Sequence, residues 1–269
     1  MIFRKVKDNC DNMCELLGLS FNTPVRPNLS FKGFRLRGEA NPDGWGIAFY
    51  PDKSSQVIKE PLKAEESLLS EFIELYPKIK SKTFIAHVRL NSTAAPAHMN
   101  THPFERELDA INFAFAHNGT LTNYQKDFDD SNFKPIGKTD SEAAFCHLLN
   151  KIKDKKIKFF DNSNYNWLLE EIRYINNYGK FNCLFSDGEH LFCYYDMNGY
   201  NSLFYLHREA PYDHTHLSDE HFDIHLKKQE ATEKEGYIIT TKPLTNEKWQ
   251  KFEPGELKIL KNGKIKNND

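Results

Sequence analysis

The chain has 269 residues, of which 39% are hydrophobic and 13% aromatic. These proportions exclude collagen-like, low-complexity and wholly disordered chains, which lack the apolar surface that offsets the entropy of ordering. Lysine plus arginine numbers 36 against 38 for aspartate plus glutamate, so the chain lacks the net positive charge that usually accompanies binding to nucleic acid or to an anionic membrane. We expect neither partner.

The cysteines and the start of the chain bear on its location. Five cysteines stand at positions 10, 14, 146, 183 and 193, with no CxxC pair among them. This pattern disfavours a secreted disulfide framework and a zinc ribbon. No apolar run reaches the ~18 residues of a membrane-spanning helix, and the first dozen residues lack the apolar stretch of a secretory signal. These features predict a cytoplasmic protein.

Short runs rich in aromatic or β-branched residues predict strands in the first half of the chain. The expected strands are 14–19, 44–50, 83–90 and 112–116. The first of them is expected to end before Pro24 and Pro27. Between the strands, apolar residues at helical spacing predict a helix over 64–76.

The second half begins with two helices. Thr139 and Glu142 match a capping box that opens one helix, and another is expected over 165–176. The expected strands are a hairpin over 181–195 that turns at Asp187-Gly188, then 202–206, 237–241 and 257–260, with a polar stretch at 213–235 and a frayed tail at 262–269. Strands before, between and after two central helices predict an α+β sandwich, in a single domain over 14–261.

Each polar motif has a structural explanation when it is taken alone. Cys14 is compatible with an ordinary buried thiol, Asn118-Gly119 with a two-residue hairpin turn, and Asp140 with a favourable charge in the first turn of a helix. Arg89 is harder to explain, because an arginine that ends an apolar strand is favoured where its rigid fork grips a carboxylate.

The joint order of the motifs points to a family. MCELLG, NPDGWGIAFY, HVR, NTHPF, AHNGTL and TDSE follow one another along the chain. This set resembles the class II glutamine amidotransferases, and most closely their small stand-alone members of the YafJ type, which have no synthase domain. The resemblance extends from Met13 to about Leu257. It implies a four-layer α/β/β/α N-terminal nucleophile (Ntn) hydrolase sandwich of two mostly antiparallel sheets, with no cofactor and no metal.

The resemblance also implies roles for five residues. Cys14 would be the nucleophile that forms a thioester with glutamine, and its own α-amine would be the base. The Asn118 side chain and the Gly119 backbone N–H would form the oxyanion hole, since acyl transfer needs donors aimed at one developing negative oxygen. Arg89 would hold the substrate α-carboxylate and Asp140 its α-ammonium group.

Other polar residues are weaker candidates. Ser92 or Thr93 falls where relatives place a substrate-contacting hydroxyl. His98 and His102 are expected to have ordinary loop roles. The four histidines between 213 and 226 supply enough imidazoles for a metal, but exposed loop histidines are far commoner and the family implies no metal.

The residues before Cys14 conflict with this mechanism, because an amide nitrogen cannot act as a base. Either Met13 is the true start, and its removal exposes Cys14, or residues 1–13 are a propeptide that is cut away. The first explanation is favoured, since the segment is polar and carries no recognised processing signal.

Three functions therefore stay open. One is hydrolysis of the γ-amide of glutamine, with any released ammonia passed to a synthase partner. Another is hydrolysis of γ-glutamyl peptides such as glutathione, which share the same α-carboxylate and α-ammonium groups. The third is a catalytically silent glutamyl-binding subunit, if Cys14 stays blocked.

Overall fold

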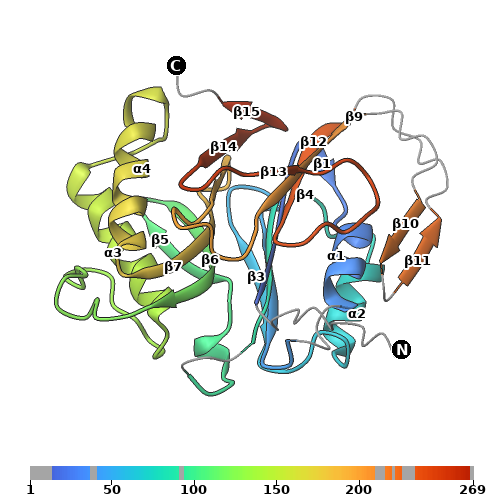
Figure 1. Cartoon of the computed structure of the whole chain (residues 1–269), viewed down its shortest axis with the longest axis horizontal. Coiled ribbons are helices and arrows are strands. Elements are labelled where there is room, and N and C mark those ends of the chain that lie inside the picture. The colour runs from blue at the N-terminus through green and yellow to red at the C-terminus, as the bar shows by residue number, and fades with distance from the viewer. Residues whose placement is uncertain are drawn as a thin grey trace, which may run out of the picture.

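The structure is a computed structural model that describes residues 14–36, 41–90, 94–209, 216–219, 222–225 and 234–266. It has four layers, in which two β-sheets face each other and two helices cover the outer face of each sheet (Figure 1). Neighbouring strands in both sheets run antiparallel. The predicted α/β/β/α sandwich is confirmed.

The first sheet has seven strands in the order β13-β9-β12-β1-β4-β2-β3. Their bounds are β1 Glu15–Val25, β2 Trp45–Phe49, β3 Gln56–Glu60, β4 Ser81–Val88, β9 Phe204–Glu209, β12 Glu235–Thr240 and β13 Gln250–Lys251. Strand β1 lies at the centre of this sheet and begins directly after Cys14. The sheet therefore holds the residues that follow Cys14 on both sides, with pairing to β4 from Glu15 and to β12 from Leu17.

The second sheet has six strands in the order β15-β14-β8-β7-β6-β5. Their bounds are β5 Phe104–Leu108, β6 Ile111–Leu121, β7 Gly179–Ser186, β8 His190–Tyr194, β14 Leu257–Lys261 and β15 Lys264–Lys266. A separate pair is formed by β10 His216–Asp219 and β11 Phe222–His225.

Helices form the outer layers. Their bounds are α1 Asn28–Arg35, α2 Leu68–Leu75, α3 Asp140–Lys155 and α4 Asn162–Asn176, with a 3₁₀ turn at His98–Asn100. Helices α3 and α4 cover the six-stranded sheet, and α1 and α2 cover the seven-stranded one (Figure 1). Each layer boundary is filled by one apolar cluster, so burial holds all four layers together.

Strand alternation decides which side chain enters which layer. On β6, Phe115 packs in the cluster under α3 and α4, whereas Ala116 packs in the cluster between the sheets. Successive side chains of a strand point to opposite faces. The same alternation turns His117 toward α3 and Asn118 toward the layer between the sheets.

Two strands are longer than the sequence predicts. Strand β1 continues through Pro24 to Val25. Its pairing with β4 shifts register between Ser20 and Val25, so the ladder does not require a backbone N–H from Pro24. Strand β6 continues to Leu121 through Asn118 and Gly119, which pair with β7. The hairpin-turn interpretation of Asn118-Gly119 is therefore wrong.

Two segments expected to be irregular contain strands. Residues 264–266 form β15, because Asn262 and Gly263, both at positive φ, make the tight turn that brings this strand back onto β14. The polar stretch at 213–235 contains β10 and β11 and the first residue of β12.

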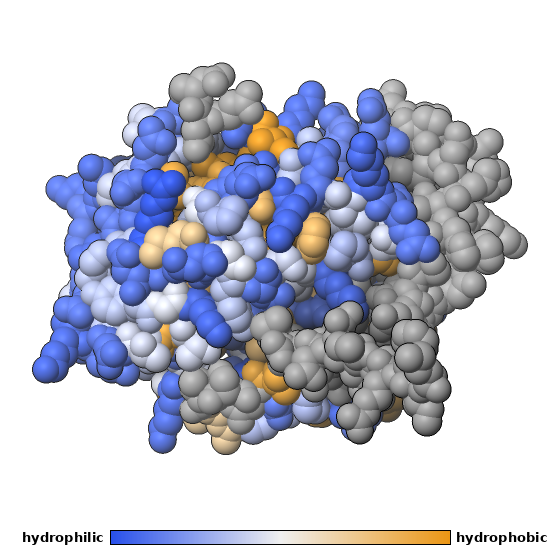
Figure 2. Space-filling view, in the orientation of Figure 1, coloured by the Kyte–Doolittle hydropathy of each residue, from blue (hydrophilic) through white to orange (hydrophobic). Residues whose placement is uncertain are grey.

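The molecular surface carries few apolar groups in the view of Figure 2, where hydrophobic residues form small groups among hydrophilic ones. Helix α2 is an exception to the usual burial of an amphipathic face, since Leu68 is 82% exposed and, of its apolar residues, only Ile73 is buried. Among the described residues, no helix has both the length and the apolar character needed to cross a membrane.

Candidate active site

Cys14 lies where the central strand of the first sheet begins. Its thiol Sγ accepts a hydrogen bond from the Leu90 backbone N–H at 3.1 Å and lies 3.2 Å from the Leu90 carbonyl oxygen. These contacts hold the sulfur against the residue that follows Arg89, at the end of β4. The residue as a whole is half-buried.

Arg89 is almost fully buried beside this cysteine, with 4% of its surface exposed. One guanidinium nitrogen donates to the Asp43 carbonyl oxygen at 3.3 Å, and another donates to the carbonyl oxygen of Ala94. The backbone of Arg89 is fixed as well, because its N–H donates to the Gly44 carbonyl at 2.7 Å. Main-chain carbonyl oxygens on two sides therefore hold the guanidinium in place.

Asn118 comes from the other sheet and reaches the same point. Its side-chain amide donates to the backbone carbonyl oxygen of Cys14, and the residue is 1% exposed. Gly119 follows with φ +157°, and a Cβ at this position would stand 2.0 Å from the Lys180 carbonyl oxygen. Only glycine allows β6 and β7 to approach this closely.

Asp140 opens helix α3. Its carboxylate accepts the Leu121 backbone N–H at 2.6 Å, which ties the helix to the end of β6. As predicted, Thr139 is the N-cap and accepts from the Glu142 N–H at 3.2 Å, so Asp140 does not need to cap the helix. The reciprocal half of the capping box is absent, because the Glu142 carboxylate instead accepts from Arg106 and from the Gly137 N–H.

The charges of two predicted site residues affect the pKa of the Cys14 thiol. Burial raises the pKa of the Cys14 thiol to about 11, while the Arg89 charge lowers it and the Asp140 charge raises it. Burial lowers the pKa of Arg89, and the charges of Cys14, Asp43 and Asp140 oppose that shift. A thiol thus lies within reach of one cation and one anion that come from different elements. Such a pair matches the two charged ends of an amino acid.

Two further histidines lie beside predicted site residues and are not among those predicted from the sequence. His87 precedes Arg89 by two residues on β4, and His117 precedes Asn118 on β6. Both are buried, and burial lowers the pKa of His87 to about 3. His102, expected to have a loop role, is also buried, with its ring centroid 4.2 Å from that of His87. His87 stands two residues before Arg89 in the HVR motif, and His117 stands two residues before Gly119 in the AHNG motif. Residues i and i+2 of a strand share a face, so this spacing was the signal in the sequence that the two histidines lie near site residues.

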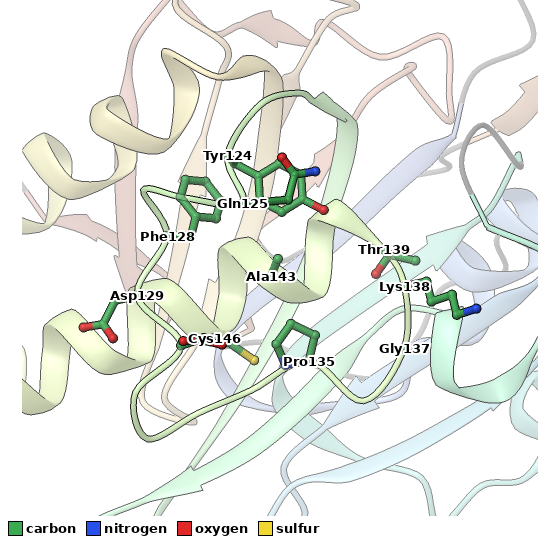
Figure 3. Close-up of a pocket in the computed structure, with 11 residues that line it drawn as sticks. Tyr124, Gln125, Phe128, Asp129, Pro135, Gly137, Lys138, Thr139, Ala143 and Cys146 are labelled. Atoms are coloured by element: carbon green, nitrogen blue, oxygen red, sulfur yellow. The ribbon is translucent and has the colours of Figure 1, made fainter.

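A cavity of about 210 Å³ lies beside the first turns of α3, between this helix and the loop that precedes it (Figure 3). Its lining includes Tyr124, Lys138, Thr139 and Cys146 but none of the five predicted site residues. Tyr124 connects the two regions, because the Asp140 charge helps to raise the pKa of its phenol.

Several weaker candidates cannot be placed at this site. Ser92, Thr93 and residues 1–13, with Cys10, lie outside the described residues, as do His214 and His221. His216 and His225 are paired in the backbone register of β10 and β11. His98 is exposed. Within the described part of the chain, no group of three or more His, Cys, Asp or Glu side chains is arranged to hold a metal ion.

Comparison with known proteins gives the family. The family model described as "Glutamine amidotransferases class-II" matches residues 13–269. The chain belongs to this family. The predicted resemblance is confirmed, and the family indicates an enzyme of the glutamine amidotransferase class.

Relatives that align over most of this chain support this assignment. The chain is 48% identical over 253 residues to an uncharacterized protein of Methanocaldococcus jannaschii, covering 94% of this chain and 70% of that protein. It is 38% identical over 254 residues to the putative glutamine amidotransferase YafJ of Escherichia coli, covering 92% and 97%. A crystal structure titled as a predicted glutamine amidotransferase from Pseudomonas aeruginosa superposes with a TM-score of 0.72 at 32% identity, covering 94% and 99%.

Proposed function

We propose that this amidotransferase hydrolyses the γ-amide of glutamine through a thioester on Cys14. The observation that carries the proposal is the meeting of four residues from separate parts of the fold. Cys14 directly precedes β1, Arg89 directly follows β4, Asn118 lies on β6 and Asp140 begins α3. A free amino acid has a carboxylate, an ammonium group and, in glutamine, an amide. The site offers one complementary group for each of them.

Substrate binding would use the two charged residues. Arg89 takes the α-carboxylate, because a guanidinium fork presents parallel N–H donors to two oxygens. Asp140 takes the α-ammonium. Both side chains are already oriented by main-chain bonds, Arg89 by the carbonyls of Asp43 and Ala94 and Asp140 by the Leu121 N–H. Little further ordering is then needed on binding.

The chemical step forms a C–S bond between Sγ and the amide carbon. Charge that develops on the carbonyl oxygen is stabilised by the Asn118 amide and the Gly119 N–H. The proton of the thiol passes to the α-amine of Cys14 and from there to the departing nitrogen, which leaves as ammonia. Water then attacks the thioester, and glutamate and the free thiol are released.

This step requires Cys14 to be the first residue. In the peptide-linked form the Cys14 thiol has a pKa of about 11, so at neutral pH it needs a base to ionise. A free α-amine, with a pKa of about 7.7 to 8.0, is such a base and an amide nitrogen is not. The family match begins at Met13, which agrees with a functional chain that starts at Cys14. Residues 1–13 are accordingly an extension or propeptide that activity requires to be absent.

The test compares three proteins: one that begins at Cys14 as verified by intact mass, one that retains residues 1–13, and a Cys14→Ala variant of the first. Each is incubated with glutamine, and glutamate and ammonia are measured. Release by the first protein alone is expected. A protein with a free Cys14 that releases no glutamate would refute the proposal.

The same assay separates the remaining functions. γ-Glutamyl dipeptides added in place of glutamine would be cleaved faster if the physiological substrate is a γ-glutamyl peptide. A protein from native cells that retains residues 1–13 and has no turnover would instead indicate a silent glutamyl-binding subunit. Co-purification with a synthase would identify an ammonia acceptor.

A further inference from the structure

His117 touches three elements that surround the site. It is 2% exposed and lies on β6, directly before Asn118. Its ring Nδ1 is 2.8 Å from the hydroxyl of Ser141, which follows Asp140 in α3. Its ring Nε2 is 3.0 Å from the carbonyl oxygen of Lys180, on β7. One side chain therefore connects β6, α3 and β7.

The partners determine the tautomer of this ring. The Lys180 carbonyl has no hydrogen to donate, so Nε2 must carry the proton in that hydrogen bond. Nδ1 of the neutral ring is then an acceptor, and the Ser141 hydroxyl donates to it. Burial lowers the pKa of His117, which favours this neutral form. The result is a directional chain from the Ser141 hydroxyl through the imidazole to the Lys180 carbonyl.

The ring is also packed against the glycine of the site. A Cβ on Gly119 would stand 2.7 Å from Nε2 of His117, so the imidazole occupies the space that any other side chain would need. On its other side the ring lies 4.7 Å, between centroids, from Phe181. The imidazole is thus packed between Gly119 and Phe181 in addition to its two hydrogen-bond partners.

We propose that His117 is a positioning residue that sets the distance between the oxyanion donors on β6 and the ammonium-binding carboxylate at the start of α3. The inference rests on the proposed function for its catalytic consequence. The hydrogen bond to Ser141 holds the helix end that carries Asp140. The hydrogen bond to Lys180 holds the strand that carries Asn118 and Gly119 against β7. Each bond therefore serves a different part of the reaction.

Two substitutions separate the two hydrogen bonds. His117→Gln keeps an N–H donor near the Nε2 position and so keeps the bond to Lys180, but it removes the acceptor for Ser141. His117→Asn keeps an acceptor near the Nδ1 position and removes the bond to Lys180. The same two substitutions at His147 are the matched control, because His147 is a 1% exposed histidine on α3 whose Nδ1 accepts the Asp129 N–H.

We expect His117→Gln to raise the KM for glutamine about tenfold with kcat changed less than threefold, since the helix end that binds the ammonium group loosens. His117→Asn should lower kcat about tenfold with KM changed less than threefold, since the oxyanion strand loosens. These factors are below the roughly 100-fold loss that a full 1 Å misplacement causes. Ser141→Ala, which leaves the buried ring in place, should reproduce the KM effect.

A second readout does not depend on activity. In His117→Gln, the Leu121 amide, which bonds to Asp140, should exchange with solvent at least tenfold faster than in the matched His147→Gln protein. In the unsubstituted protein at neutral pH, long-range proton–nitrogen correlation should show a bare Nδ1 and a protonated Nε2 at His117.

The inference is overturned if the Leu121 amide exchanges equally in the two glutamine variants, or if Nδ1 carries the proton. It is overturned as well if both His117 variants change kcat and KM together in an active enzyme. If the unsubstituted protein with a free Cys14 releases no glutamate, the proposed function is refuted instead. The amide-exchange and tautomer results would then be the only test of the positioning role.

Discussion

Replacing Gly119 by alanine tests the closeness of the two strands at the oxyanion hole. The added Cβ would stand 2.0 Å from the Lys180 carbonyl oxygen, whereas real Cβ contacts essentially never fall below 3.0 Å. Strand β6 must therefore move by about 1 Å or more relative to β7. The nearest obstacle is the Lys180 backbone, so no side-chain rotation can relieve this clash.

The magnitude follows from this displacement. A 1 Å shift of a catalytic donor costs on the order of 10² in rate, and loss of one oxyanion donor costs about 10² to 10³. Forcing an extra methyl group into a packed region costs about 1 to 3 kcal/mol of unfolding free energy. We expect Gly119→Ala to lower kcat at least 100-fold, to change KM much less, and to lower the melting temperature by about 5 °C.

The assay is steady-state glutamate release by protein that begins at Cys14, with thermal unfolding followed by circular dichroism. Gly18→Ala is the control, because Gly18 is a buried strand glycine and its three nearest neighbours are side-chain atoms of Leu191, Leu184 and Ile239, at 3.1, 3.2 and 3.5 Å from the added Cβ. It should keep kcat within threefold. A Gly119→Ala protein that is folded and retains the unsubstituted kcat would show that the donor at this position plays no part in the reaction.

Three further predictions use charge and pH. Asp140→Asn removes the anion expected to bind the α-ammonium group, and it should raise the KM for glutamine about 10- to 100-fold, the range for a hydrogen bond to a charged group. The control is Glu170→Gln, on the exposed face of α4, which should leave KM unchanged. Equal effects of the two substitutions on KM would contradict the role assigned to Asp140. In protein that retains residues 1–13, the thiolate fraction of Cys14 should be about 10⁻⁴ at pH 7, because the pKa of its thiol is about 11. The rate of iodoacetamide labelling, measured by peptide mass, should therefore rise about tenfold per pH unit up to pH 10. A rate that levels off near pH 8.5 would contradict the buried environment of the thiol. The pKa of His87 is about 3 in the folded protein against 6.5 in the unfolded chain, so only the unfolded state takes up a proton at His87 between these values. As pH drops below 6.5, His87 should contribute a fall in unfolding free energy of about 1.4 kcal/mol per pH unit, in addition to the contributions of His102, His117 and His147, whose pKa values burial also lowers. Urea unfolding from pH 7 to 4.5 measures this slope, and a His87→Phe protein with the same slope would assign it to other groups.

The sequence by itself determined the elements and the family. Alternating and helical patterns are local, so the hairpin over β7 and β8, the capped start of α3 and most of the strands could be predicted from the residues that form them. The ordered motifs were enough to identify the family, because each motif keeps its chemistry whatever surrounds it. Patterns of this kind carry no information about which distant segment lies opposite.

Only the tertiary structure decided how the pieces meet. The Asn118 amide reaches the carbonyl of a residue 104 positions away, and the Cys14 sulfur contacts a residue 76 positions away. Both contacts exist because two sheets stack face to face, and apolar burial drives that stacking without regard to spacing along the chain. The same packing buried His117 and left Leu68 exposed, since the environment of a side chain depends on what the neighbouring layers supply.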